Sequence, residues 1–450
     1  MDHNMTEGRE GQAIFRFTLP LIGASVLQTT YSFADSVIVG NFVGEVAFGA
    51  IGLLASLIML VNMFCTSLGS AVSIVVSQFY GAGKKEDVRE CALTAQCFTI
   101  IVSLIIIAVC LLLSYPVVVM FLAPPENMQH YSMQYFMIYS VGLFFFFSYN
   151  VVYGILRAHG DSKGAMFFLL IAAVINIFLD LLFVIVFHME VVGAALATVI
   201  SQAGSAVAAY VYMVRHYRHL NLFARGNRML SAEKVKTILK LWLPILSQTS
   251  VLSIGFIVLQ RLVNTFGAAS IEGYAAMQKV ESFIHIIPSS LNTAMANFTG
   301  QNIGANKPER VKRGYRVTAV SVMLISAAIA AVMIAFDEPL LSVFHISPEG
   351  LKRGCEHLDL LVIFMLPQSV YTVTAGLLQG AGDAKITAVA SFINLFIRVS
   401  SAYIMSLTFI GYRSLWYSLP LAWCTNCVIN YCRYRSGKWE HKALVKAGSQ

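Results

Sequence analysis

Apolar runs of about 20 or more residues follow one another along almost the whole chain, separated by short polar connections. A helix of about 20 apolar residues is long enough to cross a lipid bilayer. Of the 450 residues, 57% are hydrophobic and only 12% are charged, whereas an ordinary soluble domain has about 25% charged residues. So few charges cannot cover a water-facing surface, and the sequence therefore predicts an all-α integral membrane protein.

The apolar runs predict twelve transmembrane helices, because a helix satisfies its own backbone hydrogen bonds inside lipid. The runs near 46–80 and 270–302 exceed the thickness of the bilayer, so we expect these helices to tilt, kink or extend beyond it. The expected helices span residues 13–41, 46–80, 91–114, 130–157, 163–187, 191–215, 236–266, 270–302, 313–336, 354–379, 383–408 and 413–434.

Basic residues gather in the loops on one side of the predicted membrane. With the N-terminus inside, 25 of the 31 Lys and Arg fall in cytoplasmic segments, and Lys352, Arg353 and Arg413 fall outside. Cytoplasmic loops of membrane proteins carry such an excess. We therefore expect a multi-pass protein of the cell membrane with both termini cytoplasmic. The net charge of +8 is explained by topology, and no nucleic-acid partner is expected because the basic residues form no polar face.

The N-terminus does not have the features of a signal peptide, and the cysteines do not form a metal site. Residues 1–12 are polar and lack the basic start of a signal peptide, so the first apolar run is expected to be retained. Cys424 and Cys427 form a lone CxxC inside an apolar run. A zinc site would need a second pair or partnering histidines, so apolar packing explains these cysteines and no structural metal is expected.

The two halves of the chain repeat each other. Three pairs of segments match in the same order at offsets of 222–224 residues: 19–22 with 243–246, 77–84 with 300–307, and 154–161 with 376–383. Six spans in each half give both halves the same orientation, a parallel repeat. We expect a cytoplasmic N-terminus (1–12), an N-lobe (13–215), a basic linker that contacts anionic lipid (216–235), a C-lobe (236–434) and a cytoplasmic tail (435–450), with substrate held between the lobes and access alternating by rocking.

Polar residues inside the N-terminal half are the first candidates for a coupling site, because ionisable groups in a span are costly and usually functional. Asp35 lies in the first helix, Asn176 and Asp180 lie four residues apart in the fifth, and Thr198 lies in the sixth. Their oxygen atoms suit a proton or Na⁺. Two neighbouring carboxylates in a low dielectric do not both hold a charge easily, so one of them can carry a proton. The alternative is structural: the carboxylates cap helices or pair with buried arginines.

A second group could line a substrate cavity. Gln28 and Tyr31 precede Asp35 on one face of the first helix, and Asn150 and Tyr153 share a face of the fourth. Polar and aromatic side chains together suit amphipathic organic cations. Taken singly, each of the four also suits ordinary packing between transmembrane helices.

The C-terminal half has different chemistry. Arg398 occupies the position equivalent to Asn176, which favours a role in packing over contact with substrate. Lys279 and Glu281 are two residues apart and do not face each other, so each needs another partner. His285 lies on the same helix, and a structural role is the simpler interpretation.

The glycine-rich turn at 81–85 is not a phosphate-binding loop, because no GxxxxGK[ST] pattern occurs in the chain. No nucleophile–base pair, cofactor motif or metal set predicts an enzyme or a cofactor. Concentrative transport by such a chain would therefore draw on an ion gradient.

At these motifs the chain resembles the multidrug and toxic compound extrusion (MATE) family, in its DNA-damage-inducible-protein-F-like branch. The resemblance covers residues 13–435 and is carried by segment 31–40 (YSFADSVIVG), two Gln-x-x-Gly-Ala turns, two Gly-Asp turns and segment 176–180 (NIFLD). It implies a two-lobed, twelve-helix antiporter that exchanges drugs for H⁺ or Na⁺. It also implies a cation site at Asp35, Asn176, Asp180 and Thr198 and cavity positions at Gln28, Tyr31, Asn150 and Tyr153.

One departure concerns the C-lobe. Another branch of the family keeps acidic residues in the seventh and tenth helices, whereas here 236–266 has none and Gln368 stands at the tenth-helix position. The resemblance therefore gives no support to a C-lobe cation site.

The expected partners are small organic substrates and membrane lipids, bound to a monomer. A lipid-linked precursor flippase and a scaffold without a transport cycle remain the alternatives.

Overall fold

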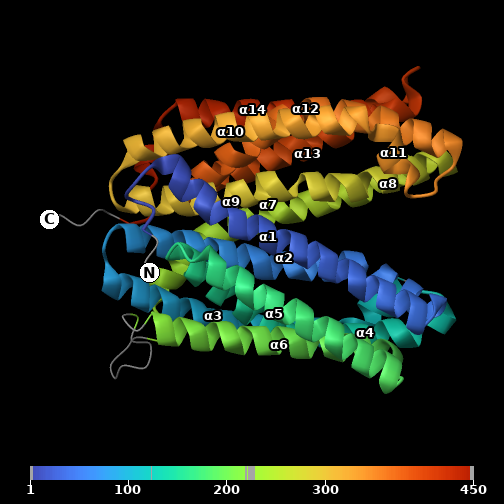
Figure 1. The fold of residues 1–450 in the computed structure, drawn as a ribbon, viewed down its shortest axis with the longest axis horizontal. Coiled ribbons are helices and arrows are strands. Elements are labelled where there is room, and N and C mark those ends of the chain that lie inside the picture. Colours follow the sequence, from blue (N-terminus) through green and yellow to red (C-terminus); the bar gives the residue numbers. More distant parts are fainter. Residues whose placement is uncertain (1–3, 123, 218–219, 221–228, 446–450) are drawn as a thin grey trace. The chain divides into compact units, whose positions relative to one another are not determined.

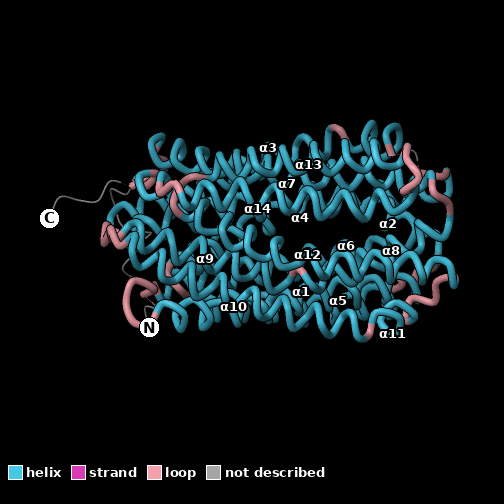
Figure 2. The backbone as a smooth tube through the Cα atoms, turned by 90° about the horizontal axis from the view of Figure 1, so that it is seen from above, coloured by secondary structure: helices cyan, strands magenta, loops and turns pink. Residues whose placement is uncertain are grey.

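Every long element in the described part of the protein is a helix (Figures 1 and 2). The computed structural model describes residues 4–122, 124–217, 220 and 229–445, and within these ranges it contains no β-strand. For residues 31–37, 45, 121, 165, 252, 254 and 256–257 it describes the backbone and not the side chains. The prediction of an all-α integral membrane fold is confirmed.

The chain divides into two compact units. Unit 1 comprises Met1–Asn4 and Leu19–Trp242. Inside it α2, α4 and α6 pack in a row, α3 lies against α4, and α5 lies against α6. The helices of this unit are α1 (Glu10–Phe42, from Leu19 onward), α2 (Glu45–Gly81), α3 (Lys85–Leu112), the π-helical η1 (Tyr115–Phe121), α4 (Glu126–Ala158), α5 (Ser162–Asp180), the π-helical η2 (Leu181–Val186) and α6 (Glu190–His216).

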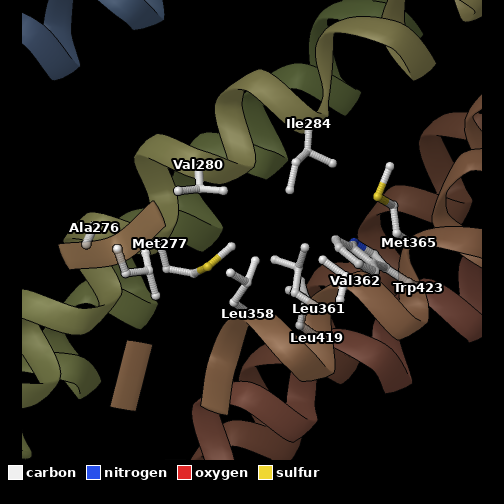
Figure 3. Close-up of a cluster of buried hydrophobic side chains, with 11 residues drawn as sticks. Ala276, Met277, Val280, Ile284, Leu358, Leu361, Val362, Met365, Leu419 and Trp423 are labelled. Carbon is white, nitrogen blue, oxygen red and sulfur yellow. The ribbon is translucent and has the colours of Figure 1, made fainter. Parts of the chain in front are cut away.

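Unit 2 comprises Met5–Thr18 and Leu243–Gln450. Its central helix is α12, which packs against α8, α9, α10 and α14. Figure 3 shows part of this core, where Met277 of α8 and Trp423 of α14 approach Leu361 of α12. The helices of this unit are α7 (Ala232–Thr265, from Leu243 onward), α8 (Ala268–Ile284), α9 (Ile286–Gly304), α10 (Pro308–Ala335), α11 (Asp337–Ser342), α12 (Pro348–Gly380), α13 (Ala384–Ser406), η4 (Gly411–Arg413), α14 (Ser414–Arg435) and η5 (Lys438–His441).

Eight helices of the described part are long and apolar enough to cross a membrane, judged by length and composition. They are α2, α3, α4, α5 continued by η2, α6, α10, α12 and α13. Each of the twelve expected spans falls on a helix or a pair of consecutive helices, with ends that differ by a few residues. The long run expected at 270–302 is divided at His285 into α8 and α9.

The repeat is visible in the way the helices touch. A Cβ added to Gly154 of α4 would lie 2.3 Å from the carbonyl oxygen of Gly69 in α2. A Cβ added to Gly376 of α12 would lie 2.4 Å from the carbonyl oxygen of Asn292 in α9. The two pairs occupy equivalent positions at the repeat offset. In both halves, therefore, two helices pack backbone to backbone at a point where a side chain would not fit.

The two Gly-Asp turns also have the same geometry. Gly160 and Gly382 have φ of 84° and 96°, the left-handed region that favours glycine. The following residues, Asp161 and Asp383, each donate a backbone hydrogen bond to the carbonyl five residues earlier, at 3.0 and 2.8 Å. These motifs end α4 and α12 in the same way, which supports the duplication inferred from the sequence.

The first turns of α1 belong to unit 2 and are held by the Glu10 ion-pair cluster, which we define as Glu10, Arg310 and Arg313. The Glu10 carboxylate lies 2.9 Å from Arg313 Nε and 3.4 Å from Arg310 Nη1. The Arg310 guanidinium also donates to backbone carbonyls of Met5, Glu7 and Gly8. The chain start is thereby fixed to α10.

The first turns of α7 belong to unit 1 and are held by the Lys234 ion-pair cluster, which we define as Lys234, Asp87 and Glu90. Lys234 Nζ lies 2.5 Å from Asp87 Oδ1 and 4.0 Å from Glu90 Oε2. Further along α7, Trp242 Nε1 donates to Ser67 Oγ at 3.0 Å. This segment is thereby fixed to α2 and α3.

The two clusters are the same contact with the charges exchanged. Glu10 and Lys234 are 224 positions apart, and the two acids of α3 precede the two arginines of α10 by 223. In one unit an acid sits between two bases, and in the other a base sits between two acids. The repeat has kept the position and reversed the polarity.

Candidate functional site

The N-lobe candidate begins with two buried polar residues on α5. Asn176 is 1% exposed and Asp180 is 0% exposed, one helical turn apart. Neither the amide nitrogen nor the amide oxygen of Asn176 has a hydrogen-bond partner among the described residues. An unsatisfied buried polar group costs about 1–3 kcal/mol. A helix that is otherwise strongly apolar therefore carries this cost for a reason other than packing.

The helix changes its hydrogen-bonding pattern directly after Asp180. Leu181–Val186 form the π-helical segment η2, for which Asp180 is the residue before the first. Single π-helical turns are uncommon and occur frequently at functional sites. This segment was not predicted, because periodicity does not separate an α-helix from a short π-helix.

Thr198 on α6 supplies the hydroxyl. It is buried, and its Oγ1 donates to the carbonyl oxygen of Ala194 at 3.1 Å. With its proton committed to the backbone, the hydroxyl oxygen can accept a hydrogen bond or coordinate a cation. Ser205, two turns further along α6, donates to the carbonyl oxygen of Phe168 in α5 at 2.9 Å and ties the two helices together.

A small apolar cluster shows how the elements meet. Ile38 and Val39 of α1 pack with Val184 of η2 and Ala194 of α6, and Ile177 of α5 borders them. Asp180 lies between Ile177 and Val184, and Thr198 lies one turn beyond Ala194. The structure thus brings α1, α5, η2 and α6 together at the level of the predicted site.

Asp35 and Tyr31 were predicted for this site and for the cavity, and their side chains lie outside the described residues. The backbone of both is part of α1. Asp35 precedes Ile38 and Val39 by three and four residues, about one helical turn. The participation of the Asp35 carboxylate therefore stays a prediction, although its backbone is placed one turn from the apolar cluster.

The other cavity candidates lie in different surroundings. Gln28 is exposed, whereas Asn150 is buried and donates to the carbonyl oxygen of Phe146 at 2.8 Å. The Tyr153 ring stacks on Tyr149 with centroids 5.7 Å apart, and the Arg157 guanidinium lies 4.3 Å above it. Their role as cavity lining stays a prediction.

Sequence reasoning missed Arg157 as a candidate. This guanidinium is buried at the end of α4, over Tyr153, and its Nε has no hydrogen-bond partner among the described residues. It stands inside the repeated segment 154–161, where the second half has Gln379. A charge present in only one copy of a repeated motif was the available signal.

The C-lobe candidates differ in their exposure and in their partners. Lys279 is exposed, while Glu281 is largely buried and its carboxylate lies 3.2 Å from His285 Nε2. Gln368 of α12 contacts the other ring nitrogen of His285 at 2.9 Å. Arg398 of α13 lies close enough to the Glu281 carboxylate to interact with it electrostatically. The partner that Glu281 needed is thus a histidine four residues later, at the break between α8 and α9.

No group of three or more His, Cys, Asp or Glu side chains in the described part of the chain is arranged to hold a metal ion. The N-lobe donors are therefore an amide, a carboxylate and a hydroxyl. Such a set of hard oxygen ligands can bind a proton on the carboxylate or a monovalent cation.

Comparison with known proteins gives consistent relatives. The MatE family model matches residues 20–182 and 244–404, so the same model fits each half once, with starts 224 positions apart. A probable multidrug resistance protein, YpnP, of Bacillus subtilis (strain 168) is 27% identical over 445 residues, which are 98% of this chain and 98% of that protein. A probable multidrug resistance protein, NorM, of Thermotoga maritima is 22% identical and covers 96% of this chain and 94% of its own length.

Solved structures show the same fold. A MOP superfamily transporter from Pyrococcus furiosus, described as having a binding pocket of reversed polarity, superposes with a TM-score of 0.91 at 22% identity and covers 98% of both chains. An outward-facing multidrug resistance MATE family transporter superposes with a TM-score of 0.90, also at 22% identity, covering 98% of this chain and 99% of its own.

Proposed function

Because the chain belongs to the MatE family, we propose that it is a multidrug efflux transporter that exports amphipathic, often cationic compounds in exchange for H⁺ or Na⁺. The full-length similarity to proteins named as multidrug resistance proteins supports the substrate class. The proposal includes a monomer in the cell membrane, both termini cytoplasmic, and two lobes that rock to alternate access.

One observation carries the coupling part of the proposal. Asp180 and Asn176 are almost completely buried in a transmembrane helix, on the turn where it becomes π-helical. Burial makes the charged form of a carboxylate expensive. Binding a proton or Na⁺ there neutralises it, and releasing the ion makes another arrangement of the surrounding helices more favourable. That dependence of conformation on ion occupancy is what antiport needs.

The gradient supplies enough energy for export. A proton that crosses about 100 mV yields about 2.3 kcal/mol, and a tenfold concentration gradient adds about 1.4 kcal/mol. The sum supports a gradient of a few hundredfold for a neutral solute moved against one proton. No nucleotide-binding motif in the chain offers another source.

The test is ethidium efflux from proteoliposomes with an imposed ΔpH or ΔNa⁺. We expect the wild type to respond to one of the two gradients, and Asp35→Asn and Asp180→Asn each to abolish gradient-driven efflux while the protein remains folded. Glu126→Gln is the matched control, because Glu126 is an exposed carboxylate in the first turn of α4. Wild-type rates in Asp180→Asn would refute the site, and efflux that ignores both gradients would refute antiport.

A further inference from the structure

The interior of unit 2 contains a continuous line of polar side chains that crosses three helices. It starts at Glu281 on α8, passes through His285 one turn later, and reaches Gln368 and Ser369 on α12. It ends at Ser326 on α10, whose Oγ lies 2.7 Å from Ser369 Oγ. Four hydrogen-bond distances of 3.2, 2.9, 3.4 and 2.7 Å join these five groups.

The chemistry of the groups gives the line one direction. The Nε2 of a neutral His285 must carry the proton to donate to the Glu281 carboxylate. Its Nδ1 then accepts from the amide of Gln368, whose Oε1 accepts from Ser369, which leaves Ser326 to donate to Ser369. Every hydrogen bond thus points toward the carboxylate. A neutral histidine with a fixed tautomer is the state in which all five groups are satisfied.

Burial separates the members of this line. The side chain of Glu281 is 12% exposed, whereas that of His285 is 39% exposed. Gln368, Ser369 and Ser326 are all buried. His285 is therefore the one member through which a proton can reach the others from the surface of the unit.

The charged and titratable groups facing Glu281 come from two neighbouring helices besides its own. Arg398 of α13 and His357 of α12 interact electrostatically with the Glu281 carboxylate, and Glu281 interacts in the same way with Tyr371 of α12. Helix α9 contributes none, since residues 286–304 contain no charged side chain. From α14, Cys427 lies near Tyr371 and Trp423 packs edge-on against His285. Arg398 can balance the carboxylate, so a charged His285 is not required for charge balance.

A second imidazole extends the arrangement beyond Glu281. His357 is 2% exposed and lies between the rings of Tyr274 and Trp416, with centroids 6.0 and 4.1 Å away. Neither of its ring nitrogens has a hydrogen-bond partner among the described residues. His357 and Gln368 are eleven residues apart, about three helical turns, and so share one face of α12. His357 interacts with Glu281 and lies on the far side of it from His285.

We propose that Glu281 and His285 form a second proton-binding site, within the C-lobe, which takes up and releases its proton through His285. When the pair gains one proton, His285 becomes an imidazolium that donates from both nitrogens. Gln368 must then turn its amide so that Oε1 faces Nδ1, and Ser369 and Ser326 reverse their hydrogen bonds. Proton occupancy on α8 is thus transmitted to α12 and α10 without any change in covalent bonds.

The proton site is tested first by nuclear magnetic resonance on the full-length protein in lipid nanodiscs, labelled with ¹⁵N in histidine and glutamine side chains. His285→Gln identifies the His285 signals, because a glutamine can keep both hydrogen bonds and cannot titrate. Gln368→Glu identifies the amide of Gln368. His130→Gln is the control, since His130 is exposed on α4 in the other unit.

We expect the His285 ring to change from the Nε2–H tautomer to the imidazolium when the pH is lowered. The Gln368 amide signal should follow with the same midpoint, become independent of pH in His285→Gln, and shift its midpoint in Glu281→Gln. A His285 ring that keeps the Nε2–H tautomer at every pH at which the protein stays folded would overturn the proposal. So would a Gln368 signal that ignores pH in the wild type, or a midpoint unaffected by Glu281→Gln.

A second measurement asks whether the site takes part in transport, and only this arm rests on the proposed antiport function. In proteoliposomes under ΔpH, His285→Gln should slow ethidium efflux at least about tenfold, which corresponds to about 1.4 kcal/mol, while ethidium binding stays unchanged. An efflux rate equal to that of His130→Gln would overturn a role in transport. Wild-type efflux that is driven by neither ΔpH nor ΔNa⁺ would instead refute the antiport proposal and leave the resonance result standing.

Discussion

Reversing the charge at the centre of the Lys234 ion-pair cluster should detach the first turns of α7 from α3. The substitution Lys234→Glu places a carboxylate beside Asp87 and Glu90, at a position where the native side chain is 5% exposed. Because the site is largely closed to water, the new charge is only partly screened by solvent. The expected consequence is a loss of stability in unit 1, which contains all three residues.

The magnitude follows from burial and distance. Removing one partner of a buried ion pair costs about 3–5 kcal/mol. Two like charges about 4 Å apart repel by about 4 kcal/mol at an effective dielectric constant of 20, and Asp87, about one third exposed, can relax away from part of this repulsion. If this relaxation removes most of the repulsion, the total stays at about 3–5 kcal/mol. At about 2–4 °C per kcal/mol, the melting temperature should fall by roughly 6–20 °C.

The assay measures the melting temperature of the detergent-solubilised protein, with fluorescence size-exclusion chromatography as the readout of the folded fraction. Lys236→Glu is the matched control, because Lys236 lies two residues away on the same helix and is exposed; it should change stability by no more than about 0.5 kcal/mol. The triple variant Lys234→Glu, Asp87→Arg, Glu90→Arg recreates the polarity of the Glu10 cluster and should recover most of the loss. Equal melting of Lys234→Glu and Lys236→Glu, or no recovery in the triple variant, would refute this account.

Two further predictions concern packing and pH. Gly154→Ala should destabilise the protein by about 1–3 kcal/mol, because the added Cβ would meet the Gly69 carbonyl. Gly52→Ala is the control: its Cβ would have no atom within 4 Å, so this variant should be neutral or stabilising in the same melting assay. Equal stability of the two variants would contradict the backbone contact. The backbone N–H of Glu10 at the helix start and the Arg313 guanidinium lower the pKa of the Glu10 carboxyl below its usual 4.5. The stability that the charged carboxylate contributes is therefore complete above pH 4.5 and is lost only as the pH falls through the lowered pKa. Hydrogen exchange of residues 5–10 should therefore stay slow at about pH 5 and quicken below about pH 4.5, and Glu10→Gln should remove this pH dependence; quickening already near pH 6 would contradict the assignment.

The positions of the helices could be predicted because hydrophobic length and turn motifs are local properties of the sequence. The expected fourth helix, 130–157, lies inside α4, and the glycine turn that follows it has the predicted place in the repeat. A kink was among the expectations for the long run 270–302, and the helix divides at His285, three residues before Pro288. The short segments η1 and α11 were not predicted, since neither is long enough to produce a periodic pattern.

The candidate sites were predictable to the extent that their residues share a helix. Asn176 and Asp180 are four residues apart, and so are Glu281 and His285. The spacing of the second pair was available from the sequence, but the partner that fixes its tautomer, Gln368, lies 83 residues further along. Likewise, nothing local indicates that the first turns of α1 bind α10, about 300 residues away. Contacts at such separations depend on the packing of whole helices.

The exchange of helix starts between the units has a consequence for the order of synthesis. The N-terminus emerges first from the ribosome, yet the arginines that bind Glu10 belong to α10 and are made about 300 residues later. In the meantime the equivalent position of its own half offers Asp87 and Glu90, whose negative charges repel Glu10. The nascent N-terminus is therefore kept from a premature partner, and its attachment to α10 waits until the start of the second half's fourth helix has been made.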